Sequence, residues 1–177
     1  INETNAAGGR KLVLIAEDDK LEAKAAIDAA RKARGHLKRV ALVGLGTGSL
    51  ACHKRSGEQW TFFEIDPLVL AYSQRRTFTF LQDCAPDARV VLGDARIELA
   101  KTAPASLDIL AVDAFSSDAI PIHLLTSEAI QDEVRTLAPD GVIAFHISNR
   151  YYDLSPAISA ALRQAGMTTL ERTTQKS

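Results

Sequence analysis

Runs of apolar residues alternate along this chain with longer stretches whose apolar residues recur at helical spacing. The runs predict strands over residues 11–16, 39–43, 60–66, 88–92, 107–112, 142–147 and 167–174. The other stretches predict helices over residues 20–38 (stopped near Gly35), 67–81, 95–102, 127–137 and 154–165, with a loop at 83–87 and a turn at 139–141. Alternating strands and helices predict an α/β fold, a doubly wound, mostly parallel Rossmann-like sheet with helices on both faces.

Composition narrows the class of protein. The 177 residues are 46% hydrophobic with a net charge of -1, which predicts one soluble domain over residues 1–177 and favours no nucleic-acid or membrane partner. No apolar run approaches the length of a membrane span. Cys52 and Cys84 follow no metal-ligand spacing and are interpreted as free thiols in a reducing compartment, so we expect a cytoplasmic protein. The run at 11–16 is expected at an edge of the sheet.

A glycine-rich turn directly follows the apolar run 39–43. Gly44, Gly46 and Gly48 let the backbone turn sharply and approach a ligand closely. Ser49 is expected to open a short helix whose N-terminal amides suit an anionic or polar group. The alternative is a tight turn without a ligand.

Two acids follow the next two strands. Glu64 comes sixteen residues after Gly48, at the spacing where an acid binds the ribose hydroxyls of a nucleoside. The alternative is an ordinary surface acid. Asp94 follows Gly93 and is placed to accept a hydrogen bond from an adenine amino group, or to cap the helix at 95–102.

The segment after the strand 107–112 is long for a loop between a strand and a helix. Asp113, its first residue, is placed to accept a proton from an amine nucleophile or to hold a cationic substrate, or merely to cap a turn. His146, inside an apolar strand, is interpreted as a hydrogen-bonded core or edge residue, and His123 is given no role. Tyr151 follows the strand 142–147 and either lines a substrate slot or is a half-buried surface tyrosine.

Acidic residues also cluster at Glu17, Asp18 and Asp19, just before the first helix. A metal site is one interpretation. We prefer the other, in which these acids face the positive end of the helix dipole, so no metal is expected.

Four of these motifs occur in the order typical of a known family. The sequence reads VGLGTG at 43–48, EID at 64–66, GDA at 93–95 and DAFSSD at 113–118. Together they resemble the spermidine synthase family, and most closely the bacterial spermidine-synthase-like proteins that are sometimes fused to membrane transporter segments. The resemblance covers about residues 26–170 and leaves residues 1–25 as an atypical extension.

The resemblance implies a class I methyltransferase fold and an activity. Family members move an aminopropyl group from decarboxylated S-adenosylmethionine to putrescine and release methylthioadenosine. Carried over to this chain, Glu64 holds the ribose, Asp94 with Ala95 meets the adenine, Asp113 is the catalytic carboxylate and Asp118 is the second acid of the substrate loop. No tightly bound cofactor is implied. S-adenosylmethionine, its decarboxylated form or methylthioadenosine is the expected ligand, a polyamine or other amine is the expected substrate, and a homodimer is an open alternative.

Two other functions stay open. The first is a methyltransferase that uses ordinary S-adenosylmethionine, and the second is a nucleoside-binding domain without turnover. Thr47 stands where the family's glycine loop usually has an acid, which favours these alternatives. Asp113 together with Asp118 favours aminopropyl transfer.

Overall fold

A computed structural model describes residues 12–16, 22–115, 120–147 and 153–172. Its strands are β1 (Leu12–Ala16), β2 (Arg39–Val43), β3 (Gln59–Glu64), β4 (Arg89–Leu92), β5 (Leu107–Val112), β6 (Leu137–His146) and β7 (Thr168–Arg172). Its helices are α1 (Glu22–Arg34), α2 (Pro67–Gln74), α3 (Phe80–Cys84), α4 (Ala95–Lys101), α5 (Ser127–Thr136) and α6 (Ser155–Gln164), with short 3₁₀ helices η1 (Ser49–His53) and η2 (Ile122–Leu124).

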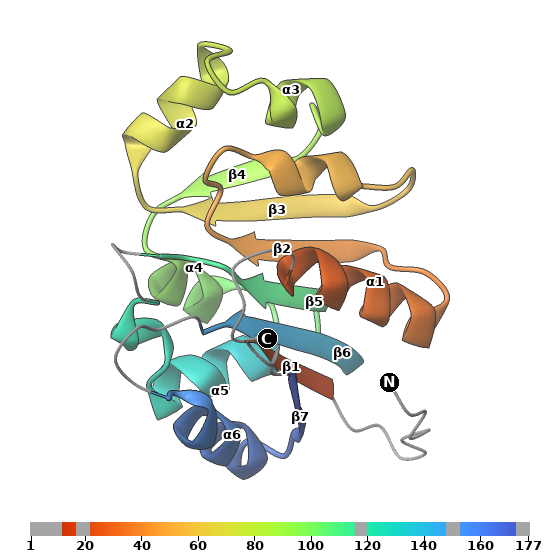
Figure 1. Cartoon of the computed structure of the whole chain (residues 1–177), viewed down its shortest axis with the longest axis vertical. Coiled ribbons are helices and arrows are strands. Elements are labelled where there is room, and N and C mark those ends of the chain that lie inside the picture. The colour runs from red at the N-terminus through yellow and green to blue at the C-terminus, as the bar shows by residue number, and fades with distance from the viewer. Residues whose placement is uncertain (1–11, 17–21, 116–119, 148–152, 173–177) are drawn as a thin grey trace, which may run out of the picture.

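The strands form one seven-stranded sheet in the order β4-β3-β2-β5-β6-β1-β7, and all its pairings are parallel. The predicted doubly wound α/β fold is therefore confirmed. Because every strand runs the same way, the carboxyl ends of β2, β3, β4 and β5 meet at one edge of the sheet (Figure 1). We call this row of strand ends the carboxyl edge, as distinct from the outer strands of the sheet.

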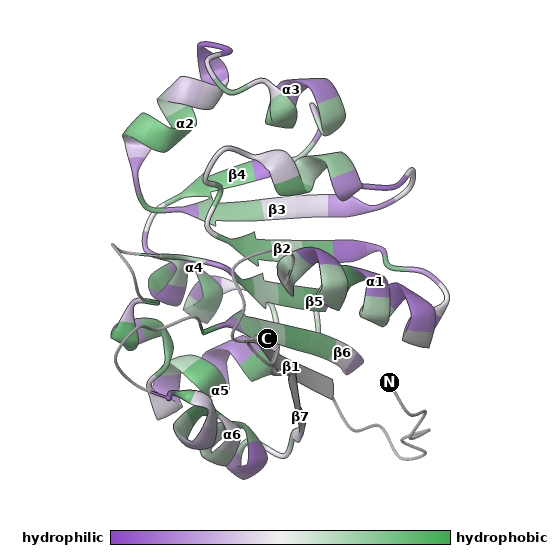
Figure 2. Cartoon of the chain, in the orientation of Figure 1, coloured by the Kyte–Doolittle hydropathy of each residue, from purple (hydrophilic) through white to green (hydrophobic). Residues whose placement is uncertain are grey.

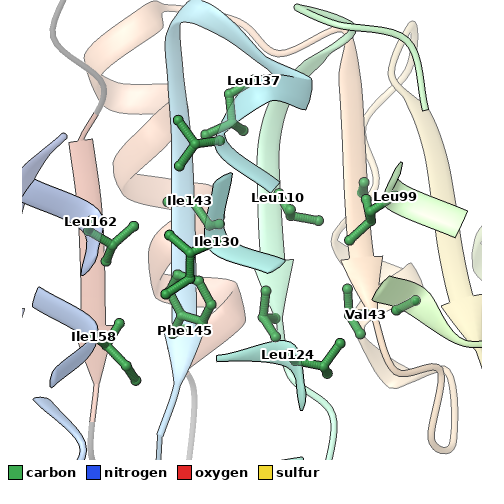
Figure 3. Close-up of a cluster of buried hydrophobic side chains, with 14 of the residues drawn as sticks. Val43, Leu99, Leu110, Leu124, Ile130, Leu137, Ile143, Phe145, Ile158 and Leu162 are labelled. Atoms are coloured by element: carbon green, nitrogen blue, oxygen red, sulfur yellow. The ribbon is translucent and has the colours of Figure 1, made fainter. Parts of the chain in front are cut away.

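Helices cover both faces of the sheet. On one face α1, η1 and α3 pack on β2, β3 and β5 through residues such as Ile27, Ala51 and Leu81. On the other face α4, α5 and α6 enclose a second cluster that includes Leu99, Ile130 and Leu162 (Figure 3). Burial on both sides explains why β5 is buried at every position instead of at alternate ones, and why its residues other than Asp108 are apolar. The hydropathy colouring shows the same hydrophobic character over most of β6 (Figure 2).

β1 joins the sheet, but the expected edge position is wrong. It lies between β6 and β7 and pairs with both, Leu12 standing opposite Val142 on one side and Thr168 on the other. An unbroken apolar run suits an interior parallel strand, because both of its backbone edges are hydrogen-bonded there.

The helix expected over residues 67–81 is divided in two. α2 ends at Gln74, and Arg76 adopts a left-handed φ of 60°. The side-chain amide of Gln82 donates to the carbonyl oxygens of Ser73 and Gln74 at the end of α2, and the Ser73 oxygen also accepts from the backbone N–H of Arg76. A second helix, α3, therefore occupies part of the expected loop at 83–87.

The interpretation of Cys52 and Cys84 as free thiols is wrong. The two residues form a disulfide that joins η1 to α3. Their separation of 32 residues gave no signal, because only the packing of α3 against η1 brings them together. Disulfides persist mainly in oxidising environments, so the argument for a reducing compartment loses its premise.

The expected turn at 139–141 lies within β6. Leu107 pairs with Leu137 and Ile109 with Val142, so β6 advances five residues where β5 advances two and bulges at this point. In the part of the chain that the structure describes, no helix is long and apolar enough to cross a membrane.

Candidate functional site

The glycine turn after β2 packs against the chain after β5. Gly44 has a φ of 98°, and a Cβ atom there would lie 2.5 Å from the carbonyl oxygen of Asp113. The backbone N–H of Asp113 donates in turn to the carbonyl oxygen of Val43 at 3.0 Å. A side chain at position 44 would therefore push apart the two segments that form the centre of the carboxyl edge.

Beyond Gly44 the turn is open on one side. Gly46 and Gly48 also have positive φ, and a Cβ at Gly46 would meet nothing within 4 Å. The helix expected at Ser49 is only the five-residue 3₁₀ helix η1, with no side-chain cap. Its dipole therefore adds little, and the open backbone of the turn is the feature suited to a ligand.

Glu64 is not an ordinary surface acid, because it is 7% exposed at the end of β3. Its Oε2 accepts a hydrogen bond from the backbone N–H of Leu45, and its Oε1 accepts one from the N–H of Asp66, both at 2.9 Å. The carboxylate thus ties β3 to the glycine turn. Each oxygen keeps a second lone pair with which it can accept a ribose hydroxyl.

Asp94 is the N-cap of α4. Its Oδ1 accepts from the backbone N–H of Arg96 at 2.9 Å, and Nε2 of His123 lies 3.5 Å from the same oxygen. The capping alternative is confirmed, and the adenine role remains a prediction that capping does not exclude. Ala95, the next residue, is buried in the cluster under α4.

Asp113 pairs with a histidine. Val112 stands opposite Phe145 in the β5–β6 ladder, which sets Asp113 beside His146 at the ends of these strands. Asp113 Oδ1 lies 2.7 Å from His146 Nδ1. The sequence interpretation named no partner for His146, although Asp113 follows one apolar run and His146 lies near the end of another, and a parallel sheet places such ends at the same edge.

The carboxylates at the other edge of the sheet have a different role. Glu58 accepts two hydrogen bonds from the Arg31 guanidinium, and Asp108 contacts Arg34 and Arg39. Burial raises the pKa of Asp108. Hydrogen bonds from the backbone N–H groups of Lys38 and Arg39 and the charges of Arg34 and Arg39 lower it by more, so that the pKa lies below its ordinary value. Glu58 and Asp108 are thus ion-paired with arginines inside the fold, and their role is structural.

By contrast, no Lys or Arg side chain in the described ranges forms an ion pair with Glu64, Asp94 or Asp113. As far as the described residues show, the carboxyl edge therefore presents acceptors without a Lys or Arg partner beside an open glycine turn. Such an edge suits a ligand that carries hydroxyls, amino groups and positive charge, and is unsuited to phosphate.

Other predicted positions are not placed. Asp118, Tyr151 and the acidic cluster at 17–19 lie outside the described residues. Within the described residues no group of His, Cys, Asp and Glu side chains could hold a metal ion.

Comparisons with known proteins point to the same fold. The polyamine aminopropyltransferase of Vibrio vulnificus (strain CMCP6) is 28% identical over 123 residues, covering 66% of this chain and 40% of the relative. A probable spermidine synthase from Corynebacterium glutamicum ATCC 13032 superposes with a TM-score of 0.60 at 24% identity, over 72% of this chain and 47% of that one. Human methyltransferase-like protein 13 in complex with SAH gives 0.65 at 22% identity, over 80% and 71%. No protein-family model matches the chain.

These comparisons confirm the likeness to the spermidine synthase family and the class I methyltransferase fold. The chain spans less than half the length of the curated relative and of the spermidine synthase that it matches.

Proposed function

Taking this likeness as the premise, we propose that the carboxyl edge binds an adenosyl ligand: S-adenosylmethionine, its decarboxylated form or methylthioadenosine. Residues 1–177 form the binding domain. Glu64 accepts hydrogen bonds from the ribose hydroxyls, Asp94 and Ala95 meet the adenine, and the turn from Gly44 to Gly48 lies under the ligand. One observation carries the proposal: buried or half-buried carboxylates, without a Lys or Arg partner among the described residues, flank an open glycine turn at adjacent strand ends.

The reaction that we propose is aminopropyl transfer to a polyamine or related amine. The amine nitrogen attacks the propyl carbon bonded to the sulfonium sulfur, and a carbon–nitrogen bond forms. The carbon–sulfur bond breaks, and its electron pair stays on sulfur as methylthioadenosine leaves. Asp113 accepts the proton that the amine gives up, and Asp118 is proposed to hold the far end of the amine.

Methyl transfer from S-adenosylmethionine is the second candidate. The likeness to human methyltransferase-like protein 13 and the presence of Thr47 in the glycine turn favour it. The same Asp113 would then accept a proton from a methylated amine. The two reactions differ in the donor, so donor preference separates them.

Calorimetric titration of the protein with the three adenosyl ligands tests the proposal. We expect binding of at least one ligand, and we expect Glu64→Gln to weaken it by about 1.5–3 kcal/mol, because a charge-assisted hydrogen bond pair is lost. Asp140→Asn, an exposed acid outside the carboxyl edge, is the matched control. No binding by the wild type, or equal affinity in Glu64→Gln, would reject the ribose site.

Transfer assays with putrescine and the two sulfonium donors then identify the reaction. Turnover of decarboxylated S-adenosylmethionine supports aminopropyl transfer, and turnover of S-adenosylmethionine alone supports methyl transfer. Binding without turnover of either donor supports the nucleoside-binding alternative. A homodimer remains a proposal, which analytical sedimentation of the protein tests. A cytoplasmic location is also a proposal, and it is tested by whether Cys52 and Cys84 are oxidised or reduced in the cell.

A further inference from the structure

The imidazole ring of His146 contacts Asp113 through one nitrogen only. His146 Nδ1 lies 2.7 Å from Asp113 Oδ1, while the other ring nitrogen, Nε2, is buried and has no hydrogen-bond partner among the described residues. The Phe115 ring stands edge-on to the imidazole, with ring centroids 4.4 Å apart and planes at 69°. The imidazole is therefore fixed by one polar contact and one aromatic contact.

We propose that His146 is a positioning residue for the acceptor chemistry at Asp113. It donates Nδ1–H to Oδ1, fixes the carboxylate plane, and leaves Oδ2 as the oxygen that receives the acceptor's proton. This inference rests on the proposed function for the identity of the reaction. The geometry of the pair is independent of it.

The unpartnered Nε2 decides which ring nitrogen carries hydrogen. An imidazolium would bury an unpaired N–H donor at Nε2, and so would the neutral ring with its hydrogen there. The neutral ring with hydrogen on Nδ1 buries only an unpaired acceptor and supplies the donor that an anionic Asp113 needs. The geometry therefore favours hydrogen on Nδ1, from where it is donated to Asp113 Oδ1.

Orientation matters because a carboxylate that accepts a proton in a transfer reaction must face the nucleophile. Asp113 side-chain exposure is 27%, so part of the carboxylate remains open while Oδ1 is committed to His146. The strand-end register of β5 and β6 sets the pair, and Phe115 limits rotation of the ring. A carboxylate held in this way needs less reorganisation when the acceptor arrives.

Two variants separate positioning from a merely structural role. His146→Asn keeps an amide donor near the position of Nδ1, whereas His146→Leu fills similar space without a donor. His36→Asn is the matched control, because His36 is exposed and precedes β2 at the opposite edge. Each is compared with the wild type for folding, methylthioadenosine affinity, kcat and KM.

We expect methylthioadenosine affinity to stay close to that of the wild type in His146→Leu, because the pair lies beyond the proposed ribose and adenine contacts. We expect kcat to fall on the order of 10- to 100-fold, because the accepting group is misaligned. His146→Asn should recover part of this loss. Equal losses of kcat in both variants, or losses that only follow the folded fraction, would overturn the positioning role.

Nitrogen-15 NMR of histidine-labelled protein tests the pair without any turnover. We expect the His146 hydrogen on Nδ1 in the wild type, and altered His146 signals in Asp113→Asn with unchanged His36 signals. Hydrogen on Nε2, or His146 signals that Asp113→Asn leaves unchanged, would overturn the inference. Failure of the proposed function has another signature, namely loss of adenosyl binding in the wild type while the Nδ1–H signal is present.

Discussion

Glu133 on α5 is a buried acid that the proposed chemistry does not use. Its side chain is 1% exposed, and neither carboxyl oxygen has a hydrogen-bond partner among the described residues. Burial raises its pKa well above the ordinary value of 4.5, and the negative charge of neighbouring Asp132 adds to the shift. Folded Glu133 therefore holds its proton at pH values where the unfolded chain releases it.

This shift predicts a pH-dependent stability. A raised folded pKa means that the free energy of unfolding falls as pH rises from about 4.5 through the folded pKa. Glu133→Gln removes this titration, so the free energy of unfolding of the variant should gain on that of the wild type as pH rises from 4 to 8. Urea unfolding at several pH values measures it, with Glu128→Gln, an exposed acid on the same helix, as the control. An unchanged pH dependence in Glu133→Gln would contradict the prediction.

For individual residues, the sequence predicted the position of the acids better than it predicted the groups to which they hydrogen-bond. Glu64, Asp94 and Asp113 could be placed at one edge because each follows an apolar run, and parallel strands bring such ends together. The hydrogen bonds from the backbone of Leu45 to Glu64 and from His146 to Asp113 depend on register and turn geometry. Neither is encoded in spacing along the chain.

Among the elements, η1 and α3 depend on each other. The disulfide between Cys52 and Cys84 joins them, and a Cβ at Gly48 would lie 3.4 Å from the backbone nitrogen of Leu81 in α3. α3 thus packs directly against the glycine turn. The sequence predicted one long helix here because Pro67 and the apolar spacing favour it, while the break at Arg76 and the pairing of the cysteines are tertiary effects.

The disulfide predicts a stability difference between oxidised and reduced protein. Closing a loop with a sequence separation of 32 residues should stabilise the fold by about 3–4 kcal/mol, because it restricts the unfolded chain. Urea unfolding with and without dithiothreitol measures the difference, and a variant with both cysteines replaced by serine should not respond to dithiothreitol. Two thiols titratable in the unfolded protein without reductant would show that the bond is absent.

For the whole molecule, the hydrophobic pattern predicted seven strands and their alternation with helices, because both faces of the sheet must be covered. It did not predict their spatial order. The sequence resemblance left β1 outside the predicted spermidine-synthase-like region, yet β1 lies between β6 and β7 in the sheet (Figure 1). A pattern of apolar residues reports that a strand is buried, and says nothing about which neighbours bury it.

The interior position of β1 makes it necessary to the far half of the sheet. β7 pairs with β1 alone among the described strands, and β6 pairs with β1 on one side and β5 on the other. Deleting residues 1–16 should therefore remove both ladders, detach β7 and expose one side of β6. Deleting residues 1–11 removes none of the paired positions and is the control.

Hydrogen exchange measures this role of β1 in the intact protein. We expect the amides of residues 12–16 to exchange as slowly as those in β6, because an interior parallel strand has hydrogen-bonded neighbours on both sides. Among the described strands β4 is an edge strand that pairs with β3 alone, and its amides should exchange faster.

In the variant without residues 1–16 the protection of β7 should be lost first, whereas β2, β3 and β5 retain their own pairings. Measuring the proposed adenosyl binding in this truncated variant then shows whether the half of the sheet that contains β2, β3 and β4 folds without β1 and β7. Rapid exchange over residues 12–16 in the full chain, or full protection of β7 in the truncated one, would show that β1 does not occupy the interior position.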